Sequence, residues 1–104
     1  MLDTFISAIH ARRKLRVHFF SKEDGHVLRR TCAPMDYAPS RRAHDRRSRF
    51  HFWDYDSDTG SHTLSLLPER VRSIELLPET FDPAEFVTWS PTTWTTPRNW
   101  GRYS

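Results

Sequence analysis

The sequence has a single cysteine and no long hydrophobic run. With Cys32 alone, the chain can form no internal disulfide and offers no cysteine cluster for a metal ion. No stretch approaches the roughly eighteen apolar residues that a membrane-spanning helix needs, and residues 1–13 lack the basic start and apolar core of a signal peptide. We therefore expect a cytoplasmic protein without a membrane partner.

Motifs for catalysis and metal binding are also missing. The six histidines form no H-x-x-x-H pattern, so we expect no metal and no cofactor. Two catalytic alternatives remain open: Cys32 with His18 across paired strands, or the aspartates Asp54, Asp56 and Asp58 on one face. No oxyanion-hole sequence supports the first, and aspartates are common in turns for backbone reasons. We expect a protein that is not an enzyme, with no catalytic residues.

What the chain has in abundance is arginine and aromatic residues. Residues 1–52 hold 12 Lys/Arg and 5 Asp/Glu, whereas residues 53–104 hold 4 and 8. Lys14 and Lys22 are the only lysines, so the basic half is rich in guanidinium groups, which match phosphate oxygens and stack on flat rings. A solvated basic surface is the alternative interpretation. This asymmetry predicts an anionic partner.

The pattern of residues predicts one helix followed by about five short strands. The helix is expected over residues 3–13, and the strands lie between about residues 15 and 77, with an Asp24–Gly25 hairpin turn and another turn at residues 56–60. Pro34 and Pro39 are expected to bracket an irregular stretch, and Asp82 to cap one helical turn. Strands joined by hairpins, without helices between them, favour a small antiparallel barrel.

The domain is expected to span residues 1–86, followed by a tail at residues 87–104. Aromatic residues make up 13% of the chain, which gives 104 residues enough bulk for a core. The tail is rich in threonine and contains Trp89, Trp94 and Trp100, whose spacing fits neither a helix nor a strand. We consider two roles for it: it covers the domain's own surface, or it docks on a neighbouring subunit.

The order of these segments resembles a WYL domain, a small Sm-like or SH3-like barrel found mostly in bacterial transcription regulators. Residues 8–17 (AIHARRKLRV) resemble the family's first helix and strand, and Cys32-Ala33-Pro34 its V-E-P-like corner. Residues 50–56 (FHFWDYD) align with the Trp-Tyr-Leu motif, and residues 66–75 (LLPERVRSIE) with the closing motif. Residues 77–86 resemble the usual ending, so the resemblance covers roughly residues 2–86.

The resemblance implies a module that senses an anionic ligand, often nucleic acid or a nucleotide. This chain departs from the family at the Trp-Tyr-Leu motif, which reads Phe50-His51-Phe52, and at Leu67, where a basic residue is usual. One expected basic contact is therefore missing. The chain begins at the first helix, so we expect a separate DNA-binding regulator to be a partner in any transcriptional role.

The candidate binding site combines the arginine-rich loop with the face of one strand. Alternation places Phe50 and Phe52 in the core and turns His51, Trp53 and Tyr55 to the other face. Guanidinium groups beside such a face can neutralise phosphates while the rings stack on bases, and the binding would be sensitive to salt. Packing and internal ion pairs are the alternative roles of these side chains. The predicted site residues are Arg41, Arg42, Arg46, Arg47, Arg49, His51, Trp53, Tyr55 and Arg70.

Single-stranded nucleic acid or a nucleotide-like anion is therefore the expected partner, in a bacterial transcription or defence context. The alternative is a protein interaction or assembly module that uses a barrel edge and the tryptophan-rich tail, with a homo-oligomer as one outcome.

Overall fold

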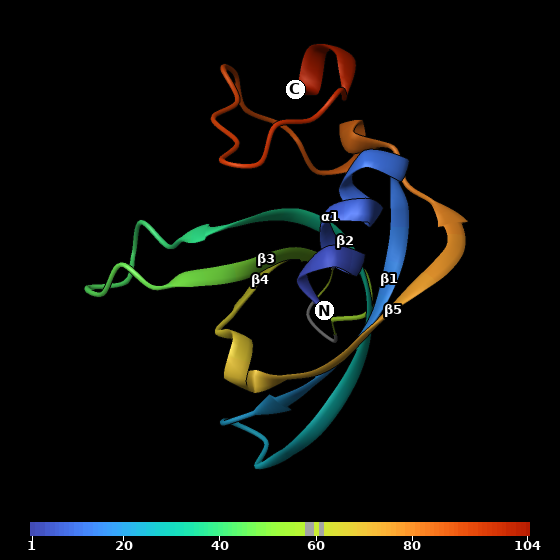
Figure 1. Ribbon diagram of the computed structural model, residues 1–104. Coiled ribbons are helices and arrows are strands. Elements are labelled where there is room, and N and C mark those ends of the chain that lie inside the picture. The colour runs from blue at the N-terminus through green and yellow to red at the C-terminus, as the bar shows by residue number, and fades with distance from the viewer. Residues whose placement is uncertain (58–59, 61) are drawn as a thin grey trace.

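The computed structural model describes residues 1–57, 60 and 62–104, which form one helix and one five-stranded antiparallel sheet (Figure 1). The strands are ordered β4-β3-β2-β1-β5, and every neighbouring pair is antiparallel. The elements are α1 (Leu2–Ala11), β1 (Arg13–Ser21), β2 (His26–Pro39), β3 (Ser48–Asp54), β4 (His62–Leu66), β5 (Val71–Thr80) and the short 3-10 turns η1 (Pro68–Arg70), η2 (Pro83–Glu85) and η3 (Gly101–Tyr103).

The helix is displaced slightly from the range expected from the sequence. It begins at Leu2 and ends at Ala11, because Arg12 adopts a left-handed conformation with φ 54° and donates its backbone N–H to the carbonyls of the preceding turn. This conformation ends a helix and turns the chain directly into β1. On its buried side, the Phe5 ring contacts Phe50 and Phe52 edge-on, with centroid distances of 5.0 and 5.4 Å.

The mainly β class with an N-terminal helix is confirmed, but closure of the sheet into a barrel is not. β4 and β5 are the two ends of the sheet, and no pairing between them joins its edges within the described residues. The η1 turn leads directly from one edge strand to the other, so the sheet curls without completing the circle (Figure 1).

Strand β2 is longer than expected, and this corrects the irregular stretch anticipated between the two prolines. It runs from His26 to Pro39, with a register shift between Pro34, paired with Phe52, and Asp36, paired with His51. The bulge accommodates Met35 without breaking the pairing. After the register shift, Asp36 pairs with His51, and its carboxylate accepts backbone N–H groups of the tail.

Local expectations that depend on turn chemistry are confirmed. Gly25 has φ 72° and its N–H reaches the Ser21 carbonyl at 2.8 Å, which closes the β1–β2 hairpin. Asp82 caps η2, because its carboxylate accepts the N–H of Ala84, and the carboxylate of Glu85 accepts the N–H of Asp82. Residues 58 and 59 of the next expected turn lie outside the described residues.

The tail packs on the rest of the chain and contributes to its core. Trp100 is 1% exposed and clusters with Phe81 and Phe86 at centroid distances of 5.5 and 6.2 Å. Its Nε1 donates to the Ile9 carbonyl at 2.8 Å, which ties the end of the chain to α1. Figure 1 shows residues 87–104 as a folded segment above the sheet. No helix among the described residues has the length and apolar character to cross a membrane.

Candidate anion-binding groove

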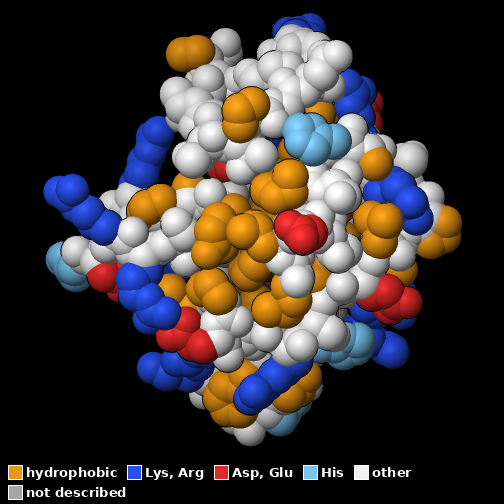
Figure 2. All heavy atoms as spheres, in the orientation of Figure 1, with side chains coloured by type: hydrophobic (Ala, Val, Ile, Leu, Met, Phe, Trp, Pro, Cys, Tyr) orange, Lys and Arg blue, Asp and Glu red, His pale blue; other side chains and the backbone are white. Residues whose placement is uncertain are grey.

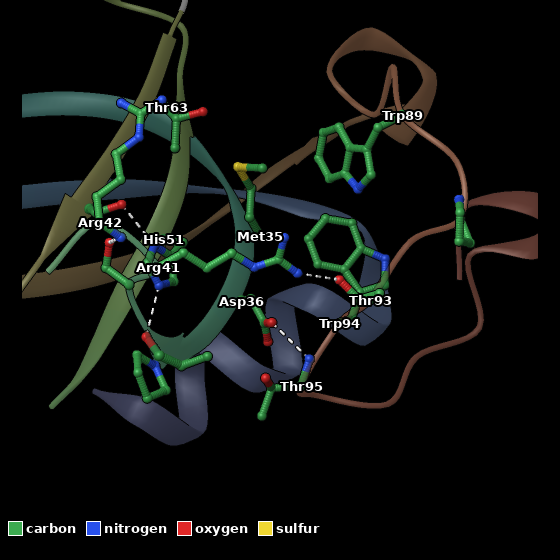
Figure 3. Close-up of a pocket in the computed structure, with 15 residues that line it drawn as sticks. Met35, Asp36, Arg41, Arg42, His51, Thr63, Trp89, Thr93, Trp94 and Thr95 are labelled. Atoms are coloured by element: carbon green, nitrogen blue, oxygen red, sulfur yellow. Dashed lines mark hydrogen bonds between the residues drawn. The ribbon is translucent and has the colours of Figure 1, made fainter. Parts of the chain in front are cut away.

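A hollow of about 760 Å³ lies between the outer face of the sheet and the tail. We call it the tail groove. Its floor comes from β2, β3 and β4, one wall from the loop after β2, and the other wall from the tail (Figure 3). Its lining residues are Met35, Asp36, Ala38, Pro39, Ser40, Arg41, Arg42, His51, Thr63, Ser65, Trp89, Pro91, Thr93, Trp94 and Thr95.

Asp36 fixes the tail wall of the groove in place. Its carboxylate accepts the backbone N–H groups of Thr95 and Thr96 at 2.8 and 3.0 Å. Arg98 adds a third contact to the same carboxylate at 3.4 Å and donates to the Met35 carbonyl. A buried carboxylate is stabilised by such charge-assisted donors, and in turn it orders the segment that supplies them.

Arg98 is held between two indole rings. Its guanidinium lies 4.1 Å from the centroid of Trp94 and 4.4 Å from that of Trp100. The side chain is fully buried, and this desolvation lowers the pKa of Arg98 to about 10, while the charge of Asp36 opposes the shift. Arg98 therefore remains a cation at neutral pH and links the groove wall to the core.

The loop wall presents two guanidinium groups to the groove. Arg41 and Arg42 are both exposed, and Arg41 reaches across the groove to the hydroxyl of Thr93 at 3.0 Å. Figure 3 shows these arginines on the side opposite Trp89 and Trp94. The two indoles meet edge-on at 5.6 Å, and Trp89 is 42% exposed. Cationic and flat aromatic groups thus face each other across one hollow.

His51 forms part of the floor and is held by both of its ring nitrogens. Nε2 lies 2.8 Å from the Ala38 carbonyl, and Nδ1 lies 2.7 Å from the Ser65 hydroxyl. Because a carbonyl only accepts, Nε2 must carry a proton, and in the neutral ring Nδ1 then accepts from Ser65. His51 can offer a ligand its ring surface, but its ring nitrogens are already engaged.

The other aromatic residues of the predicted site are covered by neighbouring parts of the chain. Trp53 stacks on Phe86 at 5.9 Å with an angle of 17° between the rings. Lys14 places its Nζ 4.4 Å above the ring of Tyr55. Burial raises the pKa of Tyr55, and the nearby charge of Glu85 raises it further. Only the His51 end of this face opens into the tail groove.

Two of the predicted arginines form internal ion pairs. Arg47 Nη2 contacts both carboxylate oxygens of Glu69 at 2.5 and 2.8 Å, which joins the loop to η1. Arg49 binds the Asp45 carboxylate at 2.8 and 3.2 Å, and this hydrogen bonding lowers the pKa of Asp45 to about 2. Exposed pairs of this kind contribute little to stability, but they occupy guanidinium groups that a ligand would otherwise use.

The remaining predicted arginines lie outside the tail groove. Arg46 is an exposed residue of the loop. Arg70 lines a second hollow at the edge of β4, together with Arg49. The structure therefore brings together Arg41, Arg42 and His51 of the predicted set, and separates them from Arg70.

The residues considered for catalysis are not arranged as a catalytic site in the described part of the chain. In the β1–β2 register, Cys32 lies opposite Leu15 and His18 lies opposite Arg29, and the His18 Nδ1 contacts Ser73 at 2.9 Å. Asp54 is 2% exposed. No three His, Cys, Asp or Glu side chains of the described residues converge as metal ligands. Asp58 lies outside these residues.

Cys32 should be unreactive in the folded protein. It is fully buried, and this burial raises the pKa of its thiol, with a further increase from the charge of Asp54. Since the thiolate is the reactive form, we expect no labelling by a disulfide reagent such as DTNB in native buffer and complete labelling in denaturant. Rapid labelling of the native protein would contradict this burial.

Sequence reasoning missed Asp36 and the tail residues as parts of one groove. The one available signal was the spacing of Trp94, Arg98 and Trp100, because a lone arginine between tryptophans can stack on both. Asp36 gave no such signal, since its partners lie 59 to 62 residues away along the chain.

Comparison with known proteins supports the fold. No protein-family model and no curated protein matches this sequence. Among solved structures, the chain is similar to proteasome accessory factor B/C (PafBC) of Arthrobacter aurescens, with a TM-score of 0.61 and 22% identity. The match covers 85% of this chain and 13% of that protein. PafBC contains a WYL domain, so the likeness supports a WYL-like fold for this chain.

Proposed function

We propose that this chain is a non-catalytic binding module for single-stranded nucleic acid or a nucleotide-like anion. The observation that carries the proposal is the arrangement of the tail groove, where Arg41 and Arg42 face Trp89 and Trp94 across about 760 Å³. Guanidinium groups bind phosphate oxygens, and an exposed indole offers a surface on which a base stacks. The hydroxyls of Thr63 and Ser65 on the floor add polar contacts.

A regulatory role, in a bacterial transcription or defence context, is part of the same proposal. Its support is the likeness to PafBC, a WYL-domain-containing regulator. This chain spans only 13% of that protein. A DNA-binding regulator as partner is part of the proposal. In this role the tail groove senses the anion, and the partner reads the promoter.

Removing both groove arginines should weaken binding of a labelled single-stranded oligonucleotide by about tenfold or more, since each charge-assisted contact contributes roughly 1.5–3 kcal/mol. The measurement is fluorescence anisotropy of DNA and RNA oligomers at low and moderate salt with the Arg41→Ala/Arg42→Ala variant. Competition by a mononucleotide distinguishes a small anion from a strand.

Trp89→Ala should lower the affinity for the oligonucleotide roughly fivefold or more, because the base loses its stacking surface.

The matched control is Arg29→Ala/Arg102→Ala, which removes the same charge from exposed positions outside the groove. If both double variants weaken binding equally, attraction to net charge accounts for the result and the groove assignment is wrong. Absence of binding by the unmodified chain at either salt concentration would also refute the proposal.

The assembly alternative is weakened at one point by the packing of the tail. Trp100 is buried within its own chain and Trp94 is half-buried, so of the three tail tryptophans only Trp89 is exposed as an anchor. The free strand edges of the sheet remain available for assembly. Light scattering of the intact chain over a range of concentrations tests for a homo-oligomer.

A further inference from the structure

A second hollow, of about 450 Å³, follows the outer edge of β4. Its lining includes the consecutive residues Leu64, Ser65 and Leu66. Successive strand residues point to opposite faces of a sheet, so a hollow that all three line must run along the strand's edge rather than over one face. We call it the edge groove. Its other side is the end of β1, including Phe20.

Both strands that border the edge groove have an unpaired side there. β4 is the end strand of the sheet and pairs with β3 alone among the described strands. The pairing of β1 with β5 ends at Phe19 and Val71, whereas Phe20 and Ser21 continue to pair with β2. Unpaired strand edges present main-chain donors and acceptors to any extended chain that approaches them.

The side chains of the edge groove select the kind of chain that fits. Phe19, Leu64 and Leu66 supply an apolar floor. Lys22 and Arg70 supply positive charge at the rim, and Glu23 supplies one negative charge beside Lys22, so cations outnumber anions in the lining. Arg49 also lines the groove, but Asp45 holds its guanidinium. The guanidinium of Arg70 has no hydrogen-bond partner among the described residues, although its charge acts on neighbouring Glu69. Figure 2 shows hydrophobic side chains gathered in the middle of this face of the molecule, with both basic and acidic groups around them.

We propose that the edge groove binds an extended acidic peptide of a partner protein, which adds as a strand to β4. Main-chain hydrogen bonds to the free edge hold the peptide, its alternate apolar side chains enter the floor, and its carboxylates pair with Arg70 and Lys22. This interaction is separate from anion binding in the tail groove, because neither arginine of that groove lines the edge groove. Among the described residues, Ser65 alone borders both hollows.

The test is fluorescence anisotropy with a labelled peptide of alternating valine and glutamate, its valine–lysine counterpart, and a copy of the acidic peptide N-methylated on alternate residues. We expect the acidic peptide to bind, and we expect the valine–lysine peptide and the N-methylated peptide to bind at least about tenfold more weakly. Arg70→Glu should reverse the preference towards the lysine peptide, and Arg70→Ala should weaken the acidic peptide without reversing it. Circular dichroism of both variants checks that they fold.

Arg41→Ala/Arg42→Ala is the control, and it should leave peptide affinity unchanged while it weakens oligonucleotide binding. Equal affinity for the N-methylated peptide would overturn strand addition, and an unchanged preference in Arg70→Glu would overturn the assigned groove. Failure of the acidic peptide to bind at all would overturn the proposal. Self-association of the chain that Arg70→Glu abolishes would do the same, because a second copy would then be the occupant.

Discussion

Arg98→Ala is expected to lower the free energy of unfolding by about 3 kcal/mol or more, since removing one partner of a buried ion pair leaves the other charge uncompensated. The Arg98 side chain is 0% exposed, contacts Asp36, and lies between the rings of Trp94 and Trp100. The alanine variant loses the ion pair, the bond to the Met35 carbonyl and both stacking contacts at once. Urea denaturation followed by circular dichroism measures the change.

Arg102→Ala is the matched control for this experiment. Arg102 lies in the same tail over an aromatic ring, 5.5 Å from the centroid of Tyr103, but it is exposed. Its removal should change stability by less than about 0.5 kcal/mol. Arg98→Lys should fall between the two, because lysine keeps the charge but lacks the flat group that stacks on both indoles. A loss in Arg98→Ala no larger than in Arg102→Ala would contradict the role assigned to this residue.

The same variant connects stability to function. Arg98 and Asp36 hold the tail wall that carries Trp89 and Trp94, so releasing the tail removes the stacking surface of the tail groove. Arg98→Ala should therefore also weaken oligonucleotide binding, although Arg98 does not itself line the groove. Arg102→Ala should not.

Much of the sheet could be predicted from the sequence because local chemistry determines it. Alternation along β3 placed Phe50 and Phe52 in the core, where they are 2% and 0% exposed. The Asp24–Gly25 pair predicted the first hairpin, because a turn needs a residue that tolerates positive φ, which Gly25 supplies. These features depend on residues near one another in the chain.

The bulge and the groove could not be predicted because they depend on distant contacts. Pro34 suggested a break, yet β2 continues past it with one register shift. The tail wall exists because Asp36 meets Thr95 and Thr96, and no local pattern marks residues so far apart as partners. The arginine-rich loop was identified as basic, but its pattern did not reveal that Glu69 binds Arg47 and leaves Arg41 and Arg42 facing the groove.

Trp100→Ala should lower the free energy of unfolding by about 3–5 kcal/mol, the usual range for removing a buried aromatic ring. Trp100 is 1% exposed, contacts Phe81 and Trp94 edge-on at 5.5 Å each, and donates its indole N–H to the Ile9 carbonyl. For a domain of this size that loss lowers the melting temperature by more than about 12 °C. Differential scanning calorimetry measures it.

Trp89→Ala provides the comparison, because Trp89 belongs to the same tail but is 42% exposed. It should change stability by less than about 1 kcal/mol while weakening oligonucleotide binding. Trp100→Phe keeps a ring in the core but leaves the Ile9 carbonyl without its donor, so a loss of about 1–2 kcal/mol is expected even if the alanine variant fails to fold. Equal stability of Trp100→Phe, Trp89→Ala and the unmodified chain would mean that the tail is not part of the core. Because Trp100 belongs to the core, a chain that ends near residue 86 is destabilised for that reason alone. A difference in oligomeric state between that shortened chain and the full one would reflect a damaged core as well as a missing docking segment. Point variants of the tail are therefore the sharper test of the assembly alternative.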